Sequence, residues 1–211
     1  MIDDQYLRSF DRKYGVRTSG HVELSDTSFD ASRLDDATAY GPVNAWALRK
    51  LLRILNLPKK SSFVDLGCGL GRACIIAGEY GFAKVTGVDL APELCVVARE
   101  NLAAIRADGR KSLPIQIIQG DVWDFCDQSE DDVYFMYRAF SHTFLNDIVK
   151  KLLQKAAVRK KPLAIIYTER LSWPQSECVT VLTSNRRLRK IYEGSMLGQA
   201  FFVYRYDVQR S

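Results

Sequence analysis

The stretch FVDLGCGLG, residues 63–71, decides how the rest of the chain is interpreted. Its apolar beginning predicts a short buried strand over Phe63–Leu66, and its three glycines predict a turn that opens a helix at Arg72. Glycine lets the backbone bend sharply and lets a ligand lie against it without meeting a Cβ atom. The stretch therefore predicts the strand, turn and helix of a nucleoside-binding site.

An acidic residue follows at a suitable distance. The segment Lys84–Val88 predicts the next strand, and Asp89 ends it. A carboxylate roughly 20 residues beyond a glycine-rich turn is placed to accept hydrogen bonds from ribose hydroxyls. Asp89 is therefore the expected ribose ligand.

The glycine spacing and Asp65 argue against a phosphate-binding turn. A dinucleotide fingerprint requires Gly-x-Gly-x-x-Gly or Ala, whereas the sixth position from Gly67 is Arg72. The chain also lacks a phosphate loop that ends in Gly-Lys-Ser/Thr. The carboxylate of Asp65 would repel phosphate and suits a cation, such as the amino group of a methionine moiety.

A third acidic residue, Asp121, lies at the end of another predicted strand, Ile115–Gln119. Each of the three acids, taken singly, also fits an ordinary turn residue or helix cap. Acids at the ends of three successive strands favour a ligand site, because open α/β sheets bind ligands at the carboxyl ends of their strands.

These features resemble motif I of the class I (seven-stranded) S-adenosylmethionine-dependent methyltransferases, whose signature is hydrophobic-hydrophobic-Asp/Glu-hydrophobic-Gly-x-Gly-x-Gly. The resemblance runs from about residue 43 to residue 121, and a weaker one connects the chain to the non-SET protein-lysine methyltransferases. It implies S-adenosyl-L-methionine as cofactor. It also implies a doubly wound, mostly parallel seven-stranded Rossmann-like α/β sheet that ends in an antiparallel hairpin.

The resemblance assigns Asp65 and Gly67 to the methionine end of the cofactor and Asp89 to the ribose. Asp121 and the backbone amide of Val122 are assigned to the adenine. The complete set of expected cofactor-binding residues is Asp65, Gly67, Cys68, Gly69, Gly71, Arg72, Asp89, Leu90, Asp121 and Val122.

The remaining pattern alternates helices and strands. Helical spacing of apolar residues predicts helices from Val43 to Leu55, from Arg72 to Gly81, from Pro92 to Ile105 and from Phe144 to Ala156. Further strands are expected at 132–137 and 163–168, and a hairpin at 189–193 and 200–206, separated by Gly194 and Gly198. The domain expected from this pattern covers residues 43–211.

Residues 1–42, called the N-terminal arm below, contain few apolar positions and are expected to lie outside the core as a lid or substrate-selecting segment. Tyr40 resembles the aromatic residue that many class I methyltransferases lay over the methionine end of the cofactor. The alternative is that Tyr40 packs on the sheet edge at the start of the first helix.

The segment after the fourth strand faces the methyl acceptor in the resembled fold. Enzymes that methylate planar amino groups carry Asn/Asp-Pro-Pro-Tyr/Phe there, and this chain keeps only the last aromatic, Phe140. Tyr137 and Phe140 are therefore predicted to line an apolar channel for a flexible amine. Together with Tyr40 they form the candidate catalytic set. The alternative is that Tyr137 and Phe140 are ordinary core aromatics.

Composition narrows the class of protein. The chain has 211 residues, 47% of them hydrophobic, which is enough for one core. It shows no signal peptide or membrane span, and an odd number of cysteines, five, without a Cys-x-x-Cys pair. We therefore expect a cytoplasmic protein without a metal site. The net charge of +5 permits an acidic partner, but the basic runs 159–161 and 186–190 fit a solvated surface better than nucleic acid.

The predicted function is methyl transfer from S-adenosyl-L-methionine to an unidentified acceptor. A protein side-chain amine is slightly favoured over a small molecule, and RNA comes third. The competing hypothesis is a non-catalytic nucleoside-binding or assembly subunit that keeps the fold, since the usual signature after the fourth strand is missing.

Overall fold

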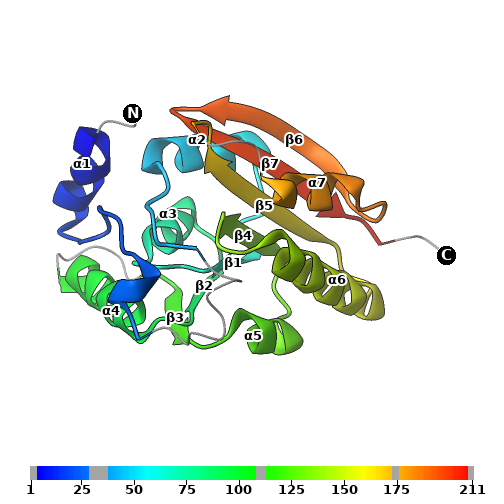
Figure 1. Ribbon diagram of the computed structural model, residues 1–211, viewed down its shortest axis with the longest axis horizontal. Helices are drawn as coiled ribbons and strands as arrows, with labels where there is room; N and C mark the ends of the chain where they lie inside the picture. Colours follow the sequence, from blue (N-terminus) through cyan, green and yellow to red (C-terminus); the bar gives the residue numbers. More distant parts are fainter. Residues whose placement is uncertain (1–3, 29–37, 108–112, 173–175, 209–211) are drawn as a thin grey trace.

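The computed structural model describes residues 4–28, 38–107, 113–172 and 176–208. Its centre is a seven-stranded sheet in the order β3-β2-β1-β4-β5-β7-β6 (Figure 1). The strands are β1 (Ser62–Leu66), β2 (Lys84–Asp89), β3 (Ile115–Gln119), β4 (Val133–Tyr137), β5 (Leu163–Arg170), β6 (Arg189–Met196) and β7 (Gln199–Tyr206). This architecture confirms the predicted fold.

Strands β1 to β5 run parallel, and β7 is antiparallel to both β5 and β6. The hairpin turns at Leu197 and Gly198, whose φ angles of 48° and 76° are typical of a tight two-residue connection. Gly194, expected to separate the two strands, lies inside β6 instead, because β6 continues to Met196.

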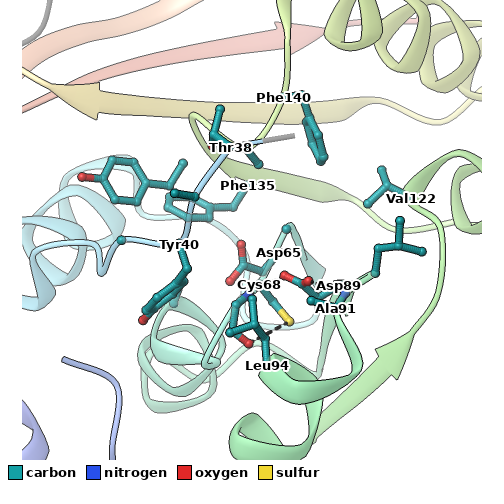
Figure 2. A pocket seen from close by; sticks show the side chains of 18 of the residues that line it. Thr38, Tyr40, Asp65, Cys68, Asp89, Ala91, Leu94, Val122, Phe135 and Phe140 are labelled. Carbon is teal, nitrogen blue, oxygen red and sulfur yellow. Dashed lines mark hydrogen bonds between the residues drawn. The ribbon is translucent and has the colours of Figure 1, made fainter. Parts of the chain in front are cut away.

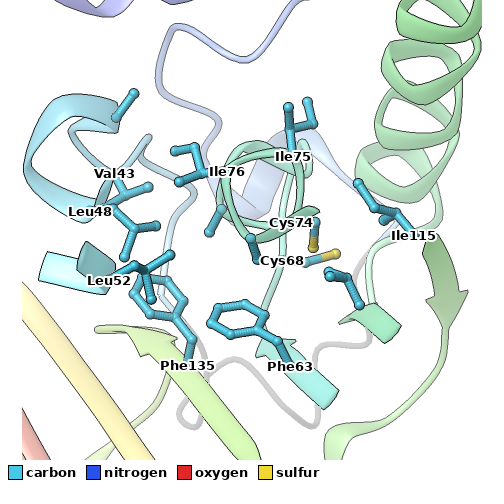
Figure 3. Packing of buried hydrophobic residues seen from close by; sticks show 14 of the residues in the cluster. Val43, Leu48, Leu52, Phe63, Cys68, Cys74, Ile75, Ile76, Ile115 and Phe135 are labelled. Atoms are coloured by element: carbon cyan, nitrogen blue, oxygen red, sulfur yellow. The ribbon is translucent and has the colours of Figure 1, made fainter. Parts of the chain in front are cut away.

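Helices cover both faces of the sheet (Figure 1). One face carries α1 (Asp4–Tyr14), α2 (Ala45–Leu55), α3 (Arg72–Tyr80) and α4 (Pro92–Ala107). The other carries α5 (Val122–Gln128), α6 (His142–Arg159) and α7 (Glu177–Ser184). On the first face, Leu48 and Leu52 of α2 pack toward Ile76 of α3 and the rings of Phe63 and Phe135 (Figure 3).

The N-terminal arm departs from expectation. It contains α1 and a short 3-10 turn, η1 (Leu24–Asp26), and its side chains Leu7, Phe10, Tyr14 and Val16 are buried. Phe10, Tyr14 and Val16 join the core cluster formed with α2 and α3. The prediction that the arm lies outside the core was therefore wrong, because four well-spaced apolar side chains were enough to bury one face of it.

Candidate active site

A hollow of about 930 Å³, open to solvent, lies where β1, β2 and β4 end (Figure 2). This is the edge at which parallel sheets bind their ligands. Among the residues proposed from the sequence, the hollow is lined by Tyr40, Asp65, Gly67, Cys68, Gly69, Arg72, Asp89, Leu90, Asp121, Val122, Tyr137 and Phe140. One proposed residue, Gly71, is not among the lining residues.

The turn after β1 requires glycine at two points. Gly67 and Gly69 have φ angles of 78° and 51°, which side chains with a Cβ atom rarely adopt. A Cβ atom at Gly69 would lie 2.0 Å from Cδ2 of Tyr40, and one at Gly67 would lie 2.7 Å from Cβ of Ala139. The turn is thus enclosed by the N-terminal arm on one side and by the segment after β4 on the other.

Gly71 allows close packing of two helices rather than contact with a ligand. It precedes α3 with a φ of 83°, and an added Cβ atom would lie 3.4 Å from Cβ of Ala98 on α4. Its lack of a side chain lets α3 and α4 approach each other behind the turn.

The carboxylates of Asp65 and Asp89 both reach the hollow (Figure 2). Burial raises the pKa of Asp65 well above its usual value, although a hydrogen bond from the Cys74 thiol opposes the shift, and the charge of Asp89 adds to it. Two buried acids that face one hollow favour a cationic or hydroxyl-bearing ligand.

Asp89 also organises the turn around it. Its Oδ2 accepts a hydrogen bond of 2.7 Å from the Gly69 amide, and its Oδ1 accepts one of 3.0 Å from the Ala91 amide. Burial raises the pKa of Asp89, and these amide bonds act in the opposite direction. The carboxylate therefore fixes the glycine turn and the start of α4 while it lines the hollow.

Asp121 has both of the roles that were considered from the sequence, helix cap and residue of the candidate ligand site. It is the N-cap of α5 and accepts a hydrogen bond of 2.7 Å from the Trp123 amide, as a helix cap does. Asp121 and the buried Val122 also line the hollow on the side of β3.

Tyr40 closes the hollow from the N-terminal arm. Its ring packs over Gly69, and its hydroxyl donates a hydrogen bond of 2.8 Å to the carbonyl of Thr18. Burial raises the pKa of this hydroxyl, so it stays protonated at neutral pH. Tyr40 pairs with Val22 in an isolated antiparallel bridge, which fixes its backbone.

The aromatics after β4 line the same hollow. The ring of Phe140 meets Phe144 of α6 edge-on, with centroids 5.3 Å apart, and the Tyr137 hydroxyl accepts a hydrogen bond of 3.2 Å from Nε of Arg170. A second hollow, of about 920 Å³, adjoins Tyr137. It is lined by His21, Thr38, Ala39, Gly41, Tyr137, Arg138 and Arg170.

Several lining residues were not proposed from the sequence, namely Thr38, Ala91, Leu94, Phe135 and Phe144. Leu94 and Phe144 stand in the first turns of α4 and α6, and the apolar spacing that predicted those helices already included them. Both residues lie near the hollow because their helices begin at the carboxyl edge of the sheet. The predicted order of strand and helix was the signal that could have identified them.

The Cys68 thiol belongs to the same hollow. A hydrogen bond with Cys74, together with burial, raises the pKa of Cys68 well above its usual value, so this thiol lines the hollow in neutral form. Among the described residues no three His, Cys, Asp or Glu side chains are grouped as metal ligands. Nor does any helix in the described ranges have the length and apolar character needed to cross a membrane.

The sheet order and the hollow at its carboxyl edge define a Rossmann-like fold of the class I methyltransferases. Residues 63–162 match the family model described as "Methyltransferase domain". This agreement confirms the resemblance found in the sequence.

Known proteins agree with this assignment. The chain is 33% identical over 91 residues to "Ribosomal protein L11 methyltransferase" of Thiobacillus denitrificans, covering 42% of this chain and 31% of the relative. It thus spans about a third of the length of that relative.

Solved structures share the fold. One is a ribosomal protein L11 methylase from Lactobacillus delbrueckii subsp. bulgaricus, with a TM-score of 0.58, 18% identity and coverage of 80% and 81% of the two chains. Another is an RNA methyltransferase from Salinibacter ruber in complex with S-adenosyl-L-homocysteine, with a TM-score of 0.57, 19% identity and coverage of 81% and 95%.

Proposed function

We propose that this protein is an S-adenosylmethionine-dependent methyltransferase. The observation that carries the proposal is the convergence of Asp65, Asp89 and Asp121 on one hollow beside the glycine turn. The three acids come from the ends of three successive strands, and the turn leaves room for a ligand against its backbone. The methyltransferase domain matched over residues 63–162 supports the same activity.

The residues present fit this cofactor. The buried carboxylate of Asp65, with its raised pKa, gains a partner when an amino group is bound beside it. Asp89 lines the hollow, and each of its oxygens accepts one backbone amide, so the carboxylate retains capacity to accept hydroxyl groups. Val122 and Leu94 supply apolar surface on which a planar base can pack.

When bound, the cofactor supplies a methyl group on a positively charged sulfur, which needs little further activation. The protein's part is to hold the acceptor close and in line and to exclude water. Tyr40 covers the glycine turn, Phe140 forms part of the wall of the hollow, and Tyr137 lies between the hollow and the adjoining one. We assign these three side chains to positioning the reacting groups.

For the acceptor we favour a protein side-chain amine. The adjoining hollow of about 920 Å³ beside Tyr137 gives a flexible side chain a route toward the cofactor site, and one relative is named for its action on a ribosomal protein. A small carboxylate-bearing molecule is the second candidate, favoured by the guanidinium groups of Arg138 and Arg170 in the adjoining hollow.

Cofactor binding is the first test. S-adenosylhomocysteine should bind with a dissociation constant in the micromolar range and should raise the melting temperature. At about 100 times its dissociation constant, a ligand adds about 2.7 kcal/mol to the free energy of unfolding. A thermal shift with NAD or ATP and none with S-adenosylhomocysteine would refute the proposal.

Catalysis needs its own test, because a non-catalytic subunit with this fold would also bind the cofactor product. Purified protein and methyl-labelled S-adenosylmethionine are incubated with cell extract separated into protein, RNA and small-molecule fractions. Label in the protein fraction is expected. Binding without transfer to any fraction would favour the non-catalytic alternative.

A further inference from the structure

Arg72 carries the most heavily engaged buried charge in the described part of the chain. It is the first residue of α3, only 2% of its side chain is exposed, and the salt bridge of its guanidinium is with Asp11 at 3.2 Å. The guanidinium also lies over the ring of Phe10, 4.9 Å from its centroid. Both partners belong to α1 of the N-terminal arm.

All three nitrogen atoms of the guanidinium have partners. Nε donates to Oγ1 of Thr18 at 2.7 Å, and Nη1 donates to the Val43 carbonyl at 3.4 Å. Nη2 donates to the Leu7 carbonyl at 3.0 Å and to Oγ of Ser19 at 3.1 Å. Arg72 lines the hollow, but four of these five acceptors, including Asp11, come from residues 7–19, so its guanidinium group is engaged by the arm.

Asp11 completes this anchor from the other side. It accepts hydrogen bonds from the amides of Thr18 and Ser19 and from the Thr18 hydroxyl, at 2.6 to 2.8 Å. Although burial alone would raise the pKa of Asp11, these hydrogen bonds outweigh burial and lower it. The carboxylate is therefore ionised at neutral pH, and it holds the turn at residues 18–19 against Arg72.

The anchored turn leads directly to the hollow. The Thr18 carbonyl accepts the hydrogen bond from the Tyr40 hydroxyl, and the Tyr40 ring packs over Gly69. Arg72 itself begins the helix that follows the glycine turn. One connected path thus runs from Arg72 through Thr18 and Tyr40 back to the turn at Gly69.

We propose that Arg72 is a positioning residue of the cofactor site, which holds the N-terminal arm so that Tyr40 closes the hollow over Gly69. Arg72 acts through Thr18 and Tyr40 and not through contact with the cofactor. This inference rests on the proposed function, since it assumes that the hollow binds S-adenosylmethionine. It also accounts for an arginine at the position where a dinucleotide-binding turn has a small residue.

A double-mutant cycle on S-adenosylhomocysteine binding tests the path. Calorimetry gives the dissociation constants of the wild type, Arg72→Met, Tyr40→Phe and the double variant. Arg72→Met should weaken binding about tenfold, equivalent to about 1.4 kcal/mol, and Tyr40→Phe should weaken it less. Because both changes break one path, the double variant should bind about as weakly as Arg72→Met alone. Losses that multiply would mean that Arg72 contacts the ligand, and would overturn the proposal.

Arg49→Met is the matched control. Arg49 also reaches the arm, through the hydroxyl of Tyr14 and the ring of Phe10, but its ion pair is with Glu79 of α3 and not with the turn at residues 18–19. Arg49→Met should leave the affinity for S-adenosylhomocysteine unchanged. An equal loss of affinity in both arginine variants would overturn the proposal, because it would indicate that α1 had loosened in general.

Thr18→Val provides an independent test if Arg72→Met fails to fold. It deletes only the hydroxyl that Arg72 Nε and Asp11 engage, and it keeps the carbonyl that Tyr40 needs. It should weaken binding in the same direction, and unchanged affinity in this folded variant would overturn the proposal. If the wild type fails to bind S-adenosylhomocysteine, the proposed function fails as well. If the wild type binds and Arg72→Met binds equally well, only this inference fails.

Discussion

Asp65 occupies a site in which its own charge is unfavourable until a cation arrives. Asp65 is 3% exposed, and this burial, together with the nearby charge of Asp89, holds its pKa well above 3.8 in the free protein. The folded state therefore binds a proton more tightly than the unfolded state. The free energy of unfolding must fall as the pH rises from 3.8 toward the raised pKa.

A bound amino group reverses this preference, because it stabilises the ionised carboxylate and releases the proton. We expect the affinity for S-adenosylhomocysteine to increase in the wild type as the pH rises from 3.8 toward the raised pKa of Asp65. Asp65→Asn should remove most of this dependence, lower the affinity and raise the stability of the free protein at neutral pH. Calorimetry and thermal denaturation over the pH series measure all three effects, and a pH-independent wild-type affinity would contradict the assignment.

Asp89 tests the ribose assignment. Asp89→Ala removes the acceptor proposed for ribose hydroxyls and should weaken S-adenosylhomocysteine binding by roughly 1.5–3 kcal/mol, the usual value for hydrogen bonds to a charged group. It also removes the acceptor of the Gly69 and Ala91 amides, so the stability should fall too. Asp147→Ala, which removes an exposed acid paired with Lys150, is the control. If Asp89→Ala loses stability but keeps its affinity for S-adenosylhomocysteine, Asp89 has only a structural role.

Among single residues, the acids and glycines could be placed from the sequence because each one ends a predicted strand or forms the turn. Their proximity then follows from the parallel sheet. The role of Arg72 could not be predicted in this way. Its partners in the N-terminal arm lie 53 to 65 positions earlier in the chain, as Ser19 and Leu7 illustrate, and no local pattern connects them.

At the scale of elements, the segment that follows β4 decides the shape of the acceptor side. Arg138 has a φ of 41°, and Ala139 packs against Gly67 within 2.7 Å of the position a Cβ atom would take. A non-glycine residue in the left-handed region is uncommon, and such conformations concentrate at functional sites. This segment is therefore held firmly where it carries Tyr137 and Phe140 to the hollow.

Phe140→Ala should lower the rate of methyl transfer while it leaves S-adenosylhomocysteine affinity nearly intact. The displacement depends on alignment, and a missing ring lets the acceptor move away from the in-line path. If Phe140 instead serves only the core, the change should cost about 3–5 kcal/mol of stability and affect binding and turnover together. Turnover, affinity and melting temperature are measured on one preparation. Unchanged turnover in a folded variant would remove this segment from the catalytic elements.

The strands and the helices α2, α3, α4 and α6 were predictable because each one carries its own apolar pattern. The three helices missed, α1, α5 and α7, have 11, 7 and 8 residues. Length alone does not explain the omission, because α2 has 11 residues and α3 has 9. Only a few apolar positions mark each of them, and α1 lies among polar residues. They are defined by packing against α2, α3 or α6, which is tertiary information that a local pattern lacks.

For the molecule as a whole, the two faces of the sheet form separate cores. The hollow is built mainly on the face that carries α2, α3 and α4, as Val43, Cys68 and Ala73 illustrate. The opposite face buries α6 through side chains such as Leu152 and Leu153, which do not line this hollow. Stability and cofactor binding should therefore be separable.

Leu152→Ala tests this separation. Leu152 is 1% exposed, and its truncation should lower the free energy of unfolding by about 2–5 kcal/mol through lost burial and a cavity. A ligand that binds only the native state adds a free energy set by its concentration and dissociation constant. At saturating S-adenosylhomocysteine, the gain in unfolding free energy should thus be the same for Leu152→Ala and the wild type in urea titrations. A smaller gain in the variant would mean that the two faces are coupled through the sheet, and the affinity losses expected for Arg72→Met and Asp89→Ala would then need correction for stability.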